Sequence, residues 1–194
     1  MRLVLGLGNP GEQYAPTRHN VAWRVLDQLA ERWRAGAGER HETFETRTAV
    51  VDGHAITLIK PLTFMNFSGT ALTVWQERHE VPESLLVVSD DVYLPIGMLR
   101  LRARGSSGGH RGLESIEAAI GSREFARLRI GVGAVAGSAG LRDHVLEAVA
   151  PDERPALDDA IRQAAEAVTC WATDGLLVAM NRFNRKVRSE ESEP

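Results

Sequence analysis

The sequence contains a single cysteine, Cys170, and no long hydrophobic run. One thiol cannot form an internal disulfide, so the chain is not a disulfide-stapled scaffold, and a reducing compartment is expected. A helix that crosses a bilayer needs about 20 mostly apolar residues, and no segment approaches that length. Residues 1–11 are interrupted by Gly6, Gly8 and Pro10, which leaves no signal-peptide core. We therefore expect a cytoplasmic protein that does not enter a membrane.

An excess of positive charge is also lacking, since 23 Lys and Arg against 26 Asp and Glu give a net charge of −3. Proteins that bind nucleic acids usually carry a basic surface, so this balance argues against a polyanionic partner. The average conceals a local bias, because residues 98–131 hold three acids and seven arginines: Arg100, Arg102, Arg104, Arg111, Arg123, Arg127 and Arg129. A basic patch on an acidic protein is therefore predicted.

The rest of the composition is that of an ordinary globular protein, with 194 residues, 43% of them hydrophobic. This length predicts one domain with a full core, at residues 1–188, and a frayed tail at 189–194. Strand patterns occur at residues 2–7, 45–51, 54–59, 85–88, 95–102 and 127–132, and helical patterns at 20–33, 70–79, 113–120 and in the segment after 141. Strands that alternate with helices predict an α/β fold, a sheet with helices on both faces.

Several local signals refine this prediction. Asp52-Gly53 joins two strand patterns and is typical of a type I′ hairpin turn. Asn20 suits a helix N-cap, Gly36 and Gly38 are expected to end that helix, and Ser68 is expected to cap the next one. The small residues at 134–140 read as a linker.

The segment Gly6-Leu7-Gly8-Asn9-Pro10-Gly11 has the spacing of a dinucleotide-binding turn after a strand. That turn must open directly into a helix whose amides hold a pyrophosphate, yet Pro10 and Pro16 interrupt the chain before any helical pattern. We therefore expect no nicotinamide cofactor. A tight turn explains the glycines but leaves Asn9 without a role.

His19 and Asp90 are the first candidates for chemistry. The pKa of a histidine suits proton transfer near neutral pH, although a lone histidine at a helix start is commonly a surface residue. Asp90 and Asp91 follow a buried strand, where open α/β sheets place their sites. A carboxylate beside His19 would fix the tautomer of the ring and favour its protonated form. Metal binding by Asp90 and Asp91 is the alternative, but no His or Cys cluster with ligand spacing accompanies them.

Other nucleophiles have less support in the sequence. Cys170 lies in a helical, apolar context and is expected in the core. Ser106 and Ser107 lie in a glycine loop without the sharp turn of a serine hydrolase. In residues 60–69, Met65 and Asn66 stand among exposed-looking apolar residues, and an amide there suits the binding of a carbonyl group beside adaptable apolar surface.

Taken together and in order, these segments resemble the bacterial-type peptidyl-tRNA hydrolases. The motifs that carry the resemblance are Gly-Leu-Gly-Asn-Pro-Gly at 6–11, Tyr14, Thr-Arg-His-Asn at 17–20, Lys-Pro-Leu-Thr-Phe-Met-Asn at 60–66, Asp90-Asp91, Gly-Gly-His at 108–110 and Arg-Leu-Arg-Ile-Gly-Val-Gly at 127–133. Each motif is weak alone, but the ordered set spans most of the chain.

The resemblance implies a single-domain α/β fold, a mixed twisted β-sheet surrounded by α-helices, in a monomeric cytoplasmic esterase with no metal or other cofactor. Its substrate would be peptidyl-tRNA, recognised at the acceptor stem and 3′ end, and cleavage would recycle tRNA from prematurely released chains. By matching position, His19 corresponds to the catalytic base and Asp90 to its orienting acid. Asn9 and Asn66 correspond to substrate-binding amides, Tyr14, Met65 and His110 to crevice residues, and Arg102 and Arg129 to contacts with the tRNA 5′-phosphate.

The chain departs from the family pattern at three positions. Arg111 stands where an asparagine is common, and its guanidinium suits a phosphate contact instead. Ser89 and Tyr93 stand where histidine and aspartate are usual. Relatives of this fold in plant organelles serve RNA splicing as binding modules, so an RNA-binding role without catalysis remains the alternative.

Overall fold

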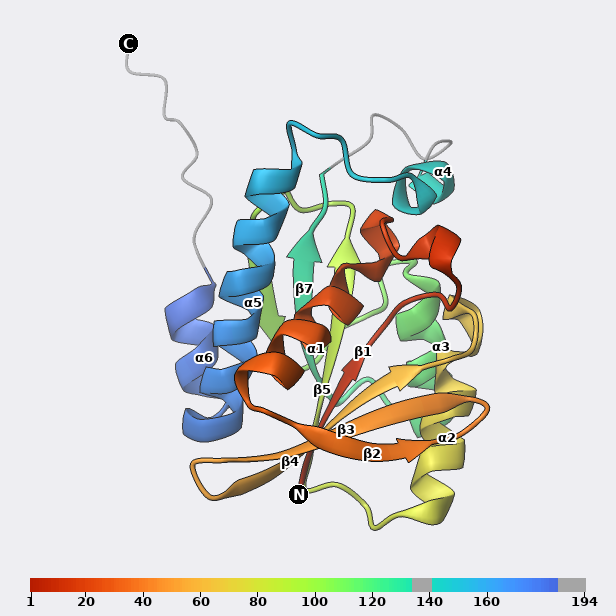
Figure 1. The fold of residues 1–194 in the computed structure, drawn as a ribbon, viewed down its shortest axis with the longest axis vertical. Coiled ribbons are helices and arrows are strands. Elements are labelled where there is room, and N and C mark those ends of the chain that lie inside the picture. The colour runs from red at the N-terminus through yellow and green to blue at the C-terminus, as the bar shows by residue number, and fades with distance from the viewer. Residues whose placement is uncertain (134–140, 185–194) are drawn as a thin grey trace.

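The computed structural model describes residues 1–133 and 141–184, which form a sheet covered by helices on both faces (Figure 1). Seven strands are present in this part of the chain, in the order β2-β3-β4-β1-β5-β7-β6. Their bounds are β1 Arg2–Gly6, β2 Gly36–Arg40, β3 Phe44–Val51, β4 His54–Pro61, β5 Ser84–Asp91, β6 Leu99–Arg102 and β7 Ala126–Gly131. The four central strands β4, β1, β5 and β7 are parallel, whereas β2, β3 and β6 pair antiparallel. The predicted α/β class and mixed sheet are confirmed.

Different helices cover the two faces of the sheet. Their bounds are α1 Val21–Arg32, α2 Ser68–Arg78, α3 Arg111–Ile120, α4 Leu141–Leu146, α5 Arg154–Asp174 and α6 Leu176–Phe183, with short 3-10 turns η1 Glu12–Tyr14, η2 Arg18–Asn20 and η3 Met65–Phe67. None of the helices in the described segments is both long and apolar enough to cross a membrane.

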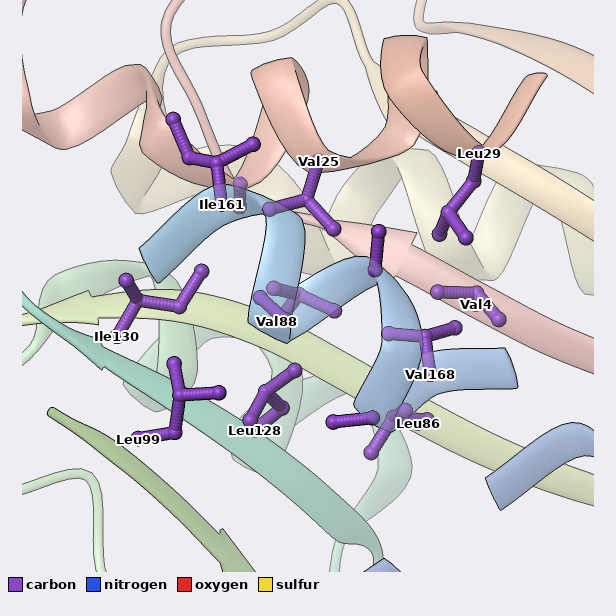
Figure 2. Close-up of a cluster of buried hydrophobic side chains, with 14 of the residues drawn as sticks. Val4, Val25, Leu29, Leu86, Val88, Leu99, Leu128, Ile130, Ile161 and Val168 are labelled. Carbon is purple, nitrogen blue, oxygen red and sulfur yellow. The ribbon is translucent and has the colours of Figure 1, made fainter. Parts of the chain in front are cut away.

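The alternation of side chains along the strands divides the core into two layers. Val4 contributes to the layer beneath α1 and α5, whereas its neighbours Leu3 and Leu5 face α2 and α3. Figure 2 shows the first layer, in which the labelled side chains come from the sheet and from α1 and α5. Burying a leucine or valine side chain stabilises the fold by roughly 1.5–3 kcal/mol, so these two layers stabilise the sheet that carries the loops.

The predicted hairpin between β3 and β4 is confirmed. Asp52 and Gly53 have φ angles of 48° and 78°, the two positive values that a type I′ turn requires. The prediction that Gly36 and Gly38 end the first helix is wrong, because α1 already ends at Arg32 and both glycines lie in β2. A Cβ atom at Gly38 would lie 2.3 Å from Thr46 Oγ1, so close approach of β2 to β3 explains that glycine.

Two further boundaries correct the sequence analysis. Ser68 is the first residue of α2 and not its cap, since its hydroxyl donates to the carbonyl oxygen of Met65 at 2.8 Å. The strand expected over 95–102 begins only at Leu99, because Pro95 to Met98 form a turn closed by the Met98 N–H. The expected linker at 134–140 and tail at 189–194 lie outside the described residues.

The parallel strands bring distant polar segments to one edge of the sheet. The chain leaves the carboxyl ends of β1, β5 and β7 at Gly6, Asp91 and Gly131. In Figure 1, α4 and the η1–η2 segment lie above this edge, and a backbone bridge joins Thr17 to Ala148. The segments that carry the predicted site residues therefore meet at this edge.

Candidate active site

A cavity of about 360 Å³ opens at the carboxyl edge of the sheet. Its walls come from η2, the end of β5, the glycine loop before α3, β7 and α4, through His19, Asp90, Asp91, Val92, Tyr93, Gly108, Gly109, His110, Arg111, Arg129 and Val145. The expected pair His19 and Asp90, which are 71 residues apart in the sequence, thus lie in one cavity.

His19 and Asp90 are in direct contact. Nδ1 of His19 lies 2.8 Å from Oδ1 of Asp90, and their side chains are 13% and 1% exposed. A buried carboxylate acceptor makes Nδ1 the protonated nitrogen of the neutral ring, so the lone pair is on Nε2. The contact therefore gives His19 the tautomer that a general base needs.

The turn that carries His19 is fixed from both sides. The Asn20 side chain accepts from the Asn9 N–H at 2.8 Å and donates to the Asn9 carbonyl oxygen at 2.9 Å. Arg18 is buried, donates to the carbonyl oxygen of Val132 at 3.1 Å and pairs with Glu153 at 2.5 Å. These contacts hold η2 in place. Because His19 lies between Arg18 and Asn20, they also limit the movement of its backbone. The sequence placed Asn20 at the helix start correctly, but its amide binds the glycine turn instead of capping α1.

His110 holds the same carboxylate from the other side. Its Nε2 lies 2.9 Å from Asp90 Oδ1, while its Nδ1 accepts from the backbone N–H groups of Gly112 and Leu113 and so caps α3. Because Nδ1 accepts two hydrogen bonds, Nε2 must be the nitrogen that donates to Asp90. The two histidine rings are 5.1 Å apart. One oxygen of Asp90 therefore orients both rings.

Burial and charge act against each other in this cluster. Burial alone would lower the pKa of His19, but the charge and hydrogen bond of Asp90 raise it above its ordinary value. Burial alone would raise the pKa of Asp90, but His19 and His110 lower it well below its usual range. The two histidines thus favour the anionic form of Asp90.

Asn9 and the 3-10 turn η3 adjoin the histidine cluster. Oδ1 of the buried Asn9 accepts from the N–H of Met65 at 2.8 Å, and its Nδ2 donates no hydrogen bond within the described segments. Met65 is itself buried and packs so closely on α3 that a Cβ atom at Gly112 would lie 2.5 Å from its sulfur. Met65 therefore supports the wall from within the core and does not line the cavity.

Tyr14 and Asn66 lie on the surface beside Asn9. The Tyr14 ring meets the exposed Phe64 edge to face, with ring centroids 6.3 Å apart. Asn66 is exposed between Phe64 and Phe67. Neither Tyr14 nor Asn66 lines the cavity. Tyr14 is half-buried, whereas Asn66 is exposed together with Phe64 and Phe67.

The arginines of the basic segment have different environments. Arg129 is only 14% exposed, pairs with Asp91 at 3.2 Å and donates to the carbonyl oxygens of Ser106 and Ser107. Arg127, which the sequence counted as part of the basic surface, is buried and pairs with Glu117 at 3.3 Å. Arg102 is exposed on the edge strand β6, outside the cavity. The polar partners of these arginines could not be read from the sequence.

Comparison with known proteins identifies the family of the chain. The family model "Peptidyl-tRNA hydrolase" matches residues 3–191. The peptidyl-tRNA hydrolase of Chloroflexus aggregans is 41% identical over 186 residues, which cover 95% of this chain and 99% of that protein. The peptidyl-tRNA hydrolase of a Synechococcus species is 46% identical over 186 residues, 95% of this chain and 83% of that protein.

Solved structures give the same result. The crystal structure of peptidyl-tRNA hydrolase from Acinetobacter baumannii superposes with a TM-score of 0.88 at 32% identity, over 95% of this chain and 94% of that chain. Purine nucleoside phosphorylase from Toxoplasma gondii, with a TM-score of 0.53 at 8% identity, shares the fold alone. The family match over nearly the whole chain, together with these relatives, shows that the chain belongs to the peptidyl-tRNA hydrolase family.

Proposed function

We propose that this chain hydrolyses the ester bond between a peptide and the 3′-terminal ribose of tRNA, with a water molecule activated by His19. The observation that carries the proposal is the 2.8 Å contact between His19 Nδ1 and a buried Asp90 oxygen in the wall of a cavity. An ester has a good leaving group, so a positioned base and a polarised carbonyl suffice, with no covalent nucleophile.

The proton path follows from the tautomer of His19. Nε2 takes a proton from water as the water oxygen attacks the ester carbonyl, and Asp90 stabilises the imidazolium that forms. The imidazolium then returns the proton to the 3′ oxygen of the ribose as the ester bond breaks. His110 keeps Asp90 in place through its own hydrogen bond to the same oxygen.

Two amides are suited to bind the carbonyl groups of the substrate. Asn9 is held through its oxygen by Met65, which leaves its Nδ2 group to donate to the substrate. Asn66 presents an exposed amide on the adjacent surface, where Tyr14 and Phe64 offer apolar contact to a peptide side chain.

The acceptor stem of tRNA would meet the basic segment. Arg102 is exposed and available for a phosphate contact, and Arg129, which pairs with Asp91, is the second arginine assigned to this contact. On this proposal the protein acts as a monomer in the cytoplasm and recycles tRNA from chains released before completion.

Release of peptide from purified peptidyl-tRNA tests the proposal, with His19→Ala as the inactive reference and a chelator in a parallel reaction. We expect wild-type release that the chelator leaves unchanged. His19, Asp90 and His110 offer three ligand atoms within 4.8 Å of one another, so loss of activity in chelator and its recovery with a divalent ion would instead assign the cluster to a metal. Binding of tRNA without release would favour the RNA-binding alternative.

A further inference from the structure

Arg18 carries a buried positive charge directly beside His19. Its side chain is 6% exposed, its Nη2 lies 2.5 Å from Oε2 of Glu153, and its Nη1 donates to the carbonyl oxygen of Val132 at 3.1 Å. Its Nε has no hydrogen-bond partner among the described residues. Removing a guanidinium from water is costly, and apolar side chains of similar volume are often as stable in place of a buried ion pair. Stability is therefore a weak reason for this pair.

A second ion pair to α5 provides the contrast. Arg24 of α1 lies 2.5 Å from Asp158 of α5, and their side chains are 41% and 47% exposed. Beneath this pair, Val25 and Ile161 belong to the apolar layer between the two helices and the sheet (Figure 2). The attachment of α1 to α5 therefore has other sources than the buried charge of Arg18.

The buried pair acts on the turn η2, which carries His19. The Arg18 side chain binds Val132, which directly follows β7. β7 is the neighbour of β5, in which Asp90 lies opposite Ile130. Arg18 thus ties η2 to the strand beside the one that carries Asp90. A displacement of η2 would change the distance of 2.8 Å between His19 Nδ1 and Asp90 Oδ1.

Glu153 fixes the direction of the Arg18 guanidinium. It directly precedes α5, and its N–H donates to the carbonyl oxygen of Ala150 at 3.1 Å. The hydrogen bond from Arg18 lowers the pKa of Glu153 below its ordinary value, and the charge of His144 contributes in the same direction. A charged carboxylate forms a short, directional hydrogen bond with a guanidinium. The start of α5 thus determines where Arg18, and with it η2, lies.

We propose that Arg18 and Glu153 are positioning residues, which hold the imidazole of His19 at hydrogen-bond distance from Asp90. The proposal rests on the proposed function, in which His19 is the general base. Neither Arg18 nor Glu153 lines the cavity, so both act through His19 and not on the substrate. A misplacement of about 1 Å can lower the rate about a hundredfold, so a tether beside the base serves the reaction even where it adds no stability.

Replacing both charges together tests this role. The double variant Arg18→Met, Glu153→Met removes the pair without changing the net charge near His19. We expect kcat on peptidyl-tRNA to fall about tenfold with KM unchanged, because the substrate contacts remain while the base is less well placed. The titratable groups in contact with His19 are Asp90 and His110. The pKa of the His19 ring, followed by NMR, should move down, since Asp90 raises it less from a greater distance.

The double variant Arg24→Met, Asp158→Met is the matched control, because it removes an arginine–carboxylate pair of the same length that also reaches α5. It should leave both kcat and the pKa of His19 unchanged. Equal losses in the control would overturn the proposal, since they would arise from the attachment of α1 to α5. A normal kcat and an unchanged His19 pKa in the first double variant, at whatever stability, would overturn it as well.

Glu153→Gln provides a milder test at a side chain that is 31% exposed. Glutamine keeps a hydrogen-bond acceptor for Arg18 but removes the charge, so kcat should fall about threefold at a pH at which His19 is neutral. Full activity in this variant would overturn the role of Glu153. The NMR titration needs no turnover. A fall in the His19 pKa in the first double variant, in a protein that releases no peptide, would support the positioning of His19 and contradict the proposed function alone.

Discussion

Two cavities lie at opposite ends of the same sheet, and the larger one is not the candidate active site. The cavity of about 570 Å³ at the amino ends of the strands is lined by Arg2, Glu83, Glu124 and Trp171, among others. Glu83 pairs with the N-terminal amine and Glu124 with Arg104, at 3.8 and 3.7 Å, and both carboxylates are 66% exposed. The smaller cavity at the carboxyl ends contains a carboxylate that is 1% exposed and bound at 2.8 and 2.9 Å.

The carboxyl-end cavity is the candidate active site because buried polar groups converge there, and not because of its volume. Solvent screens the exposed ion pairs of the amino-end cavity, so these pairs contribute little to the stability of the fold. At the carboxyl end the parallel strands deliver Asp90 into a buried position, where two histidines can change its pKa. Substitutions at the two ends of the sheet should therefore differ strongly in their effects on kcat.

The largest difference is expected between His19→Ala and Glu124→Gln. Removing the general base should lower kcat by about two to four orders of magnitude, whereas the exposed Glu124 lies outside the candidate site and its substitution should leave kcat within about twofold. Release of peptide from peptidyl-tRNA measures both, with circular dichroism to establish that each variant is folded. Near-normal turnover in His19→Ala would contradict the assignment of the base.

Asp90→Asn should produce the next largest loss, about ten- to a hundredfold in kcat, because the base remains but loses its charged partner. The pH profile gives a sharper readout. Only neutral His19 accepts a proton, and Asp90 raises its pKa, so wild-type kcat/KM should rise with pH through a midpoint above about 6.5. Asparagine removes the negative charge, so the midpoint should move to lower pH. An unchanged midpoint would mean that a group other than His19 determines the pH profile of kcat/KM.

Two substitutions of His110 separate its role as the cap of α3 from its role as a hydrogen-bond donor to Asp90. His110→Ala removes the cap of α3 and should lower the free energy of unfolding by about 1 kcal/mol, while His110→Asn keeps a residue that caps helices well. Both variants remove the donor to Asp90, so both should lose about tenfold in kcat. Denaturant unfolding and peptide release measure the two effects. If asparagine restored the rate together with the stability, His110 would serve α3 alone.

Much of the fold was predictable from short-range patterns. The Asp52-Gly53 turn, the buried strand β5 and the helix α3 each follow from residues that are close in the sequence. The strand β2 was missed because its glycines resemble a helix end, and only the close approach to Thr46 in β3 explains Gly38. Local patterns carry no information about such cross-strand distances.

The candidate site was predictable in its residue types but not in its connections. A histidine after a glycine turn and an acid after a core strand pointed to His19 and Asp90. Their contact, and the second hydrogen bond from His110, depend on how three separate segments meet at the sheet edge. The contrast between the tied Arg129 and the exposed Arg102 likewise depends on neighbours that are distant in the sequence.

The smallest effect is expected at Arg102, which lies on an edge strand outside both cavities. If Arg102 contacts one phosphate of the acceptor stem, Arg102→Ala should weaken tRNA binding by a few fold at moderate salt. It should also reduce the slope of log affinity against log salt by about 0.9, the contribution of one phosphate contact in a duplex. Arg162→Ala removes an equally charged, exposed residue from α5 and should leave the slope unchanged. Hydrolysis of a mononucleotide ester, which lacks the stem, should be the same in Arg102→Ala as in the wild type. A loss on that small ester as large as on peptidyl-tRNA would show that Arg102 acts on the chemistry at the carboxyl edge and not on the tRNA backbone.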